Sequence, residues 1–201
     1  MNIYRTDLAV ELKELNNKNF KDLSGVSISE EFIENFKISK VNIETQQASH
    51  QLGKSVGIYY TIDILNFKNF ISMSTNEITL ISKKISEFLN EFNLDKKQLV
   101  LVVGLGNREI TPDSLGPRII SKIISTRHIK LDINLRDQFK KLRAVAAIAP
   151  GVLGQTGIEI SEIIKSIVEK INPCAVILID ALVSQNIDRL LNYAVKLALG
   201  N

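Results

Sequence analysis

Apolar residues in the second half of the chain fall into short continuous runs that are separated by longer amphipathic stretches. Three runs are typical of strands buried on both faces of a sheet, at 99–103, 144–149 and 175–179. After each of them a helical spacing of apolar residues predicts a helix, over 113–126, 157–170 and 187–199. This alternation implies right-handed crossovers. The sequence therefore predicts an α/β sandwich with a mainly parallel central sheet between helices.

The first half of the chain predicts fewer and more polar elements. Two strands are expected near 38–45 and 56–65, joined by a connection over 46–53 that is longer than a tight turn. His50 is read as an exposed loop residue of that connection. The polar stretch 23–34 is expected to form a loop with a short helix.

Ser74 and Glu77 have the spacing of a capping box and open an amphipathic stretch that predicts a helix to about Phe92. Residues 1–17 fit either a helix or a short extended arm. The stretch 132–141 is polar with charges of both signs, which is typical of a flexible surface segment.

The predicted strand 99–103 ends in a turn that is rich in small residues. Gly104 and Gly106 allow a tight backbone turn, and Asn107 suits left-handed geometry or a side-chain bond within the turn. A dinucleotide-binding loop is disfavoured because its third glycine is replaced by Glu109.

A helix start follows this turn. Thr111 suits the N-cap, Pro112 the first helical position, and Asp113 the first turn, where the helix dipole favours a negative charge. Asp113 would then lie just beyond the carboxyl end of a central strand, the edge at which α/β sheets bind ligands. Taken alone, Asp113 fits a purely structural helix-start acid better than a catalytic residue.

The loop after the second predicted parallel strand is shaped by glycines as well. It contains Gly151, Gly154 and Gln155, and Thr156 with Glu159 has the spacing of another capping box, which favours a structural role for Glu159.

Asp180 directly follows the third predicted parallel strand, 175–179. A carboxylate at the end of a buried strand must be solvated, paired or functional, because burying it alone is costly. Asp113 and Asp180 should therefore lie at the same sheet edge, and they could approach each other if their strands are neighbours. Two such carboxylates would supply an acid and a base, as peptide hydrolysis requires.

Bulk properties set wider limits. The chain has 201 residues, which fits one domain, and no apolar run of membrane length or signal peptide is visible. Its single cysteine, Cys174, excludes an internal disulfide, and a net charge of +3 spread along the chain does not indicate a nucleic-acid surface. No cofactor motif is present. His128 is read as a helix-end residue, and a metal bound by His128 with both aspartates is the weaker alternative.

Four separated blocks resemble the germination protease family, which degrades small acid-soluble spore proteins in endospore-forming bacteria. They are Arg5–Glu11, Leu52–Ile62, Val103–Pro117, and Ala149–Glu159 continuing to Ile179–Leu182. The resemblance implies that Asp113 and Asp180 are the catalytic residues of an aspartic-type endopeptidase without a cofactor.

The same resemblance implies several further properties. It implies a zymogen that removes residues 1–7 by cleavage between Asp7 and Leu8, a homotetramer, and a three-layer fold related to the hydrogenase maturation endopeptidases. Small acid-soluble spore proteins would be its substrates, in the cytoplasm of the forespore or spore core, without nucleic-acid or membrane partners. The C-terminal part of the family domain is not found in this sequence. The alternatives are a short inactive relative that binds a peptide or partner, or a metal-dependent maturation-type endopeptidase.

Overall fold

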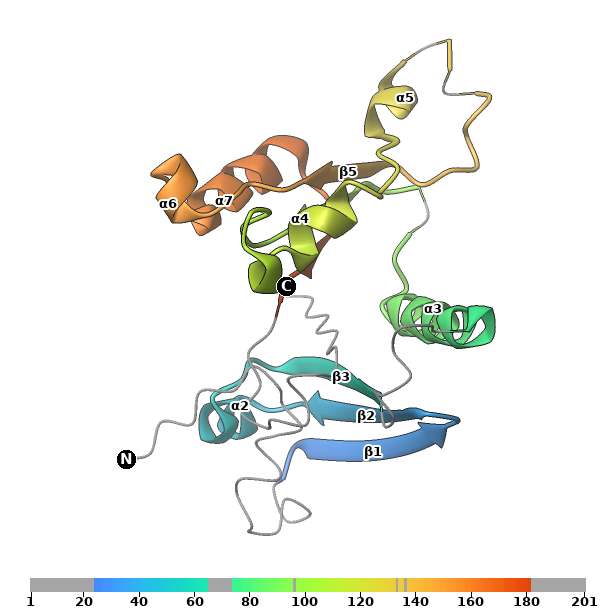
Figure 1. The fold of residues 1–201 in the computed structure, drawn as a ribbon, viewed down its shortest axis with the longest axis vertical. Helices are drawn as coiled ribbons and strands as arrows, with labels where there is room; N and C mark the ends of the chain where they lie inside the picture. Colours follow the sequence, from blue (N-terminus) through green and yellow to red (C-terminus); the bar gives the residue numbers. More distant parts are fainter. Residues whose placement is uncertain (1–23, 65–73, 96, 133, 136, 182–201) are drawn as a thin grey trace. The chain divides into compact units, whose positions relative to one another are not determined.

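The computed structural model describes residues 24–64, 74–95, 97–132, 134–135 and 137–181. These residues belong to two compact units, with 24–64 in the first and the remainder in the second. The first contains an antiparallel sheet and the second a parallel one, so the fold is mixed α/β (Figure 1). The helix or arm expected over 1–17 and the helix expected over 187–199 lie outside the described residues.

The first unit is a sheet of strands β1 (Val26–Ile33), β2 (Phe36–Ile43) and β3 (Gly57–Ile64), in the order β1-β2-β3. β1 pairs with β2 from Val26 opposite Ile43 to Ile33 opposite Phe36. The expectation of a loop with a short helix over 23–34 is therefore wrong. β1 is largely exposed and polar, so its sequence lacks the apolar pattern of a strand. Its antiparallel pairing with β2 stabilises the extended backbone instead.

The connection between β2 and β3 is helix α2 (Gln46–Leu52), where the sequence suggested a loop. Thr45 Oγ1 accepts a hydrogen bond from the Ala48 backbone N–H at 3.2 Å, and Gly53 ends the helix at φ 62°. His50 is exposed as predicted, but it lies in the last turn of α2. One side of the sheet packs on α2 through a buried cluster that consists of Val41, Ile43, Ala48, Leu52 and Tyr59.

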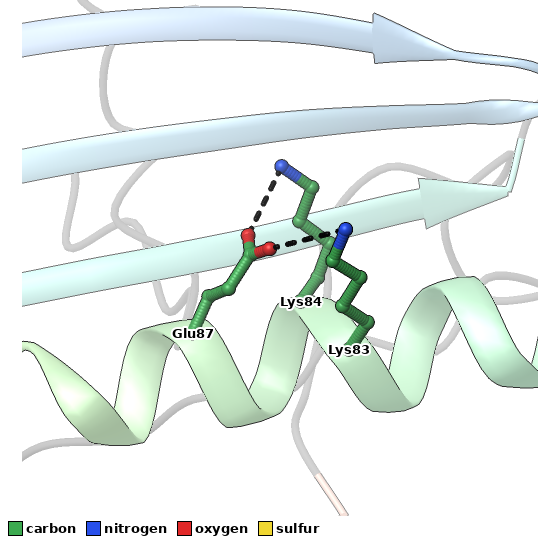
Figure 2. Close-up of polar contacts among 3 residues, drawn as sticks. All are labelled: Lys83, Lys84 and Glu87. Atoms are coloured by element: carbon green, nitrogen blue, oxygen red, sulfur yellow. Dashed lines mark ion pairs between the residues drawn. The ribbon is translucent and has the colours of Figure 1, made fainter.

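The second unit begins with helix α3 (Thr75–Asn90). The predicted capping box is confirmed, since Ser74 Oγ accepts from the Glu77 N–H and the Glu77 carboxylate accepts from the Ser74 N–H. On the exposed side of α3, Glu87 forms ion pairs with Lys83 and Lys84, at 3.9 and 3.4 Å (Figure 2).

The parallel sheet has the order β5-β4-β6, with β4 (Val100–Gly104) between β5 (Val145–Ile148) and β6 (Ala175–Ile179). All five residues of β4 are buried, which confirms the continuous apolar run as a central strand. Val100 lies opposite Val145 on one side and Ala175 on the other. The three strands predicted from apolar runs are therefore neighbours in one parallel sheet.

The helix expected over 113–126 is shorter and broken. It consists of a 3₁₀ turn, η3 (Thr111–Asp113), and helix α4 (Leu115–Ile120), and α5 (Arg127–Leu131) follows separately. Thr126, the last residue of the expected helix, is buried: its Oγ1 donates to the Arg143 carbonyl and accepts from the Val145 N–H, which ties it to the start of β5.

The helix expected over 157–170 is confirmed as α7 (Ile160–Ile171), and a separate short helix, α6 (Leu153–Thr156), precedes it. Gly157 at φ 69° separates them. The predicted Thr156–Glu159 capping box is wrong, because Thr156 Oγ1 accepts from the Ile158 N–H and Glu159 caps α7 without a side-chain hydrogen bond.

The described residues between 132 and 141 are exposed, as the polar sequence predicted for a surface segment.

Among the residues that the structure describes, none of the helices is both long enough and apolar enough to span a membrane.

Candidate active site

The carboxyl ends of β4 and β6 bring the two predicted aspartates to one edge of the sheet. Gly104, the last residue of β4, lies opposite Ile179, the last residue of β6. The Leu105 N–H then donates to the Ile179 carbonyl at 2.7 Å, so the pairing continues one residue beyond the strand. Asp180 follows Ile179 directly, and Asp113 lies in the loop that follows β4. The predicted adjacency of their strands is confirmed.

Asp113 is half-buried and is held by the turn that precedes it. Its Oδ2 accepts a hydrogen bond from the Asn107 backbone N–H at 2.7 Å. Gly106 passes the carboxylate so closely, at φ 112°, that a Cβ on it would lie 2.8 Å from Asp113 Oδ1. The small residues of the turn therefore fix the position of this carboxylate.

Thr111 does not cap a helix through its side chain, contrary to the prediction. The N-cap of η3 is Ile110, which has an extended backbone, and Thr111 is the first residue of the turn, with Pro112 next. The Thr111 carbonyl instead accepts from the Ser114 hydroxyl at 2.9 Å. Asp113 thus ends a 3₁₀ turn, where the sequence placed it in the first turn of an α-helix.

Gly116 of α4 lies against the backbone at the ends of β4 and β6. A Cβ at this position would lie 2.5 Å from the Ile179 carbonyl oxygen and 2.6 Å from the Leu105 nitrogen. Gly104 faces the same contact, because its Cβ would lie 2.5 Å from Ile120 Cγ1. Only backbone without side chains allows α4 to approach the ends of β4 and β6 this closely. Nothing in the local sequence pattern marked Gly116 as part of this site.

Asp180 is half-buried, and its Oδ1 accepts the N–H of its neighbour Ala181 at 2.8 Å. This bond to its own backbone orients the side chain at the strand end. Both carboxylates are consequently placed by short-range backbone contacts on adjacent strand ends. A site that contains both can bring an acid and a base to one substrate bond.

The loop after β5 reaches the same turn. Gln155 Nε2 donates to Asn107 Oδ1 at 3.0 Å, and the Glu109 N–H donates to the same oxygen at 3.0 Å. Gly151, at φ 82°, lies beside this contact, since a Cβ on it would be 3.0 Å from Gln155 Oε1. Among the glycines predicted to shape the site, Gly154 is not required for close packing, because a Cβ there would meet no atom within 4 Å.

The metal alternative is not supported by the donor set. His128 is exposed on α5, and across the described ranges no three His, Cys, Asp or Glu side chains are grouped so that they could hold a metal ion. Cys174, also exposed, is not part of such a group.

Fold and site together define an α/β protein with two aspartates at the carboxyl edge of a parallel sheet. The family described as germination protease matches residues 2–199, and the chain belongs to this family. The resemblance noted in the sequence is thereby confirmed.

Individual relatives support the same assignment. A germination protease of Clostridium perfringens is 41% identical over 189 residues, which cover 92% of this chain and 57% of the relative. One from Caldanaerobacter subterraneus subsp. tengcongensis is 43% identical over 188 residues, or 92% of this chain and 56% of the relative. One from Bacillus cereus is 38% identical, over 92% of this chain and 51% of the relative. The chain therefore spans a little over half the length of these curated relatives.

Proposed function

We propose that this chain carries the catalytic aspartates of an endopeptidase of the aspartic type that acts in spore germination. Membership of the germination protease family supports the peptidase assignment. The choice of Asp113 and Asp180 is supported by the register of β4 and β6. These parallel strands end opposite each other, and each aspartate follows one of them at the same edge of the sheet.

The proposed reaction is hydrolysis of a peptide bond with the two carboxylates sharing one proton. The ionised carboxylate takes a proton from a water molecule while the water oxygen bonds to the peptide carbonyl carbon. The protonated carboxylate then donates its proton to the amide nitrogen as the carbon–nitrogen bond breaks, which leaves a carboxylic acid and an amine. The pair finishes with one proton, as it began, so the cycle balances.

The finer properties that the family resemblance implies belong to the same proposal. The substrates are small acid-soluble spore proteins in the spore core, and the protein is a homotetrameric zymogen cut between Asp7 and Leu8, which lie outside the described residues. The parallel order β5-β4-β6 is compatible with a complete three-layer sandwich related to the hydrogenase maturation endopeptidases. Gly104, Gly106, Asn107, Gly151 and Gln155 shape the loops around the aspartates.

The direct test is incubation of the purified chain with a small acid-soluble spore protein, followed by mass spectrometry of the products. A parallel sample uses the chain extended with the C-terminal region of the Caldanaerobacter relative. Discrete fragments in either sample support the proposal. If neither sample cleaves and the substrate merely co-elutes with the chain, the protein is a binding module and the peptidase proposal fails.

A further inference from the structure

The side-chain amide of Asn107 has an occupied oxygen and an unoccupied nitrogen. Asn107 Oδ1 accepts the Glu109 backbone N–H at 3.0 Å and Gln155 Nε2 at 3.0 Å, which uses both lone pairs of the oxygen. This orientation of the amide follows from chemistry, because a backbone N–H can only donate and must therefore meet the oxygen. In the part of the chain that the structure describes, Asn107 Nδ2 donates to no other group. Asn107 therefore has a free N–H donor.

This free donor belongs to the turn that holds a candidate catalytic carboxylate. The Asn107 backbone N–H donates to Asp113 Oδ2 at 2.7 Å, so the same residue binds the carboxylate with its main chain and keeps an unused donor on its side chain. Asn107 is half-buried, whereas the next residues, Arg108 and Glu109, are exposed. A bound polypeptide can therefore reach the amide, and partial burial strengthens a hydrogen bond made there.

The proposed hydrolysis creates a charge that neither aspartate neutralises. When the water oxygen bonds to the peptide carbonyl carbon, an electron pair of the carbonyl moves onto its oxygen, which becomes negative. One carboxylate takes the proton of the water, and the other gives its proton to the amide nitrogen. The carbonyl oxygen is left without a partner in this scheme. A hydrogen-bond donor placed at such an oxygen stabilises the charge where it develops.

We propose that Asn107 is a further catalytic residue, whose Nδ2–H donates a hydrogen bond to the oxygen of the scissile carbonyl. The inference rests on the proposed peptidase function. No proton leaves Asn107, and the electron pair returns from the oxygen to re-form the carbonyl when the carbon–nitrogen bond breaks. The two bonds to Oδ1, from Glu109 and Gln155, hold the amide so that its nitrogen remains the free end.

Two variants of Asn107 separate this role from a structural one. Asn107→Asp keeps an oxygen for both accepted bonds but removes the donor, and Asn107→Ala removes donor and acceptor without adding a charge. Both should lower kcat about 10²- to 10³-fold with little change in KM, because the hydrogen bond forms only as charge develops. Asn134→Asp, at an exposed asparagine in the segment 132–141, is the matched control and should keep wild-type activity.

The pattern across the two variants is decisive. Loss of the donor is the change that they share, and circular dichroism with urea midpoints checks that both are folded. If Asn107→Asp stays within tenfold of wild type while Asn107→Ala is inactive, Asn107 only shapes the turn and the inference is overturned. If Asn107→Ala stays within tenfold while Asn107→Asp is inactive, the added charge is responsible and the inference is equally overturned.

Binding of a tetrahedral mimic tests the donor without catalysis. The probe is N-acetyl-tetra-alanine amide with its central peptide bond replaced by an anionic phosphinate, and the neutral, trigonal ketomethylene analogue is the control. Nuclear magnetic resonance on the full chain follows the side-chain N–H signals of Asn107, which are assigned by their absence from Asn107→Asp. The phosphinate should shift these signals and bind wild type about tenfold more tightly than the ketone, and Asn107→Ala should lose this preference.

The two measurements separate this inference from the proposed function. If neither the chain nor its extended form cleaves a spore protein, but the phosphinate shifts the Asn107 signals and Asn107→Ala loses the preference, the peptidase function fails and the donor role stands. If wild type cleaves, but the signals do not move or the preference persists in Asn107→Ala, the function stands and the inference is overturned. Absence of both cleavage and a shift removes both.

Discussion

Gln155 and Asn107 join the loops that follow two neighbouring strands, through a hydrogen bond of 3.0 Å between Gln155 Nε2 and Asn107 Oδ1. Asn107 is also the residue whose backbone N–H binds Asp113 Oδ2. The loop after β5 thus supports, through one side-chain contact, the turn that positions a candidate catalytic carboxylate. We therefore expect Gln155 to act on the candidate site as a positioning residue.

Gln155→Ala should therefore lower the rate of proteolysis by about two- to tenfold, the range expected from loss of one hydrogen bond. Stability should change little, because the contact is exposed. The measurement is a double-mutant cycle with Asn107→Ala. If the two effects multiply as independent losses, the contact does not couple the loops.

Replacement of either aspartate tests the proposed chemistry. Asp113→Asn and Asp180→Asn should each reduce the rate of proteolysis by about 10² to 10⁴, the usual contribution of a general acid or base. Circular dichroism and the urea midpoint should remain close to wild type. Asp137→Asn, an exposed aspartate in the surface segment 132–141, is the control and should retain activity. Full activity in either site variant would place the chemistry elsewhere.

The sequence predicted the strands that lead to the candidate site well where local pattern was sufficient. β4 was recognisable because a strand covered on both faces needs no polar residues, and Asp180 stood out because a charge ended such a run. The local sequence pattern could not predict the strand order β5-β4-β6, because pairing between strands far apart in sequence is a tertiary property.

The failed predictions have the same origin. β1 is polar and became visible as a strand only through its pairing with β2. Thr126, at the end of the helix predicted over 113–126, is held instead by bonds to Arg143 and Val145, which come much later in the chain.

Gly116 offers a test of how closely α4 must approach the sheet. Gly116→Ala would place a Cβ 2.5 Å from the Ile179 carbonyl oxygen, where rigid backbone cannot yield. We expect a loss of about 1–3 kcal/mol in the free energy of unfolding, together with reduced activity, because the ends of β4 and β6 are displaced.

Gly154→Ala is the matched control for this substitution. Gly154 lies in α6, and a Cβ there meets no atom within 4 Å, so the change should be neutral or stabilise by up to about 1 kcal/mol. Urea unfolding followed by circular dichroism compares the two variants. Equal stability of both would mean that α4 can move away from the sheet without cost.

Tyr59 gives the antiparallel unit a dependence on alkaline pH. Burial raises the pKa of its phenol above the usual value, so the folded state disfavours ionisation. The stability that the neutral phenol provides is complete below about pH 10 and is lost as the pH rises through the folded-state pKa.

The comparison of wild type with Tyr59→Phe isolates this effect. At about pH 8 the variant should be less stable by about 1 kcal/mol, since it lacks the 2.6 Å hydrogen bond from the Tyr59 hydroxyl to the Ser55 carbonyl. Above about pH 10 the difference should shrink, because only wild type then has a phenol to ionise. Urea midpoints at both pH values measure it, and a constant difference would contradict the prediction.

Self-processing at the N-terminus links the proposed zymogen to the two aspartates. Cleavage between Asp7 and Leu8 would need the same acid and base as cleavage of a substrate, and a mildly acidic medium should promote it if one carboxylate must hold a proton. The purified protein, extended with the C-terminal region of a relative, is held at mildly acidic pH, and the new N-terminus is sequenced over time. We expect a product that begins at Leu8 in wild type and in Asp137→Asn, but not in Asp180→Asn. An intact wild-type chain, or processing of Asp180→Asn at the wild-type rate, would remove the self-cleaving zymogen from the proposal, whereas loss of processing in Asp180→Asn alone would show that the aspartate at the end of β6 is required for it.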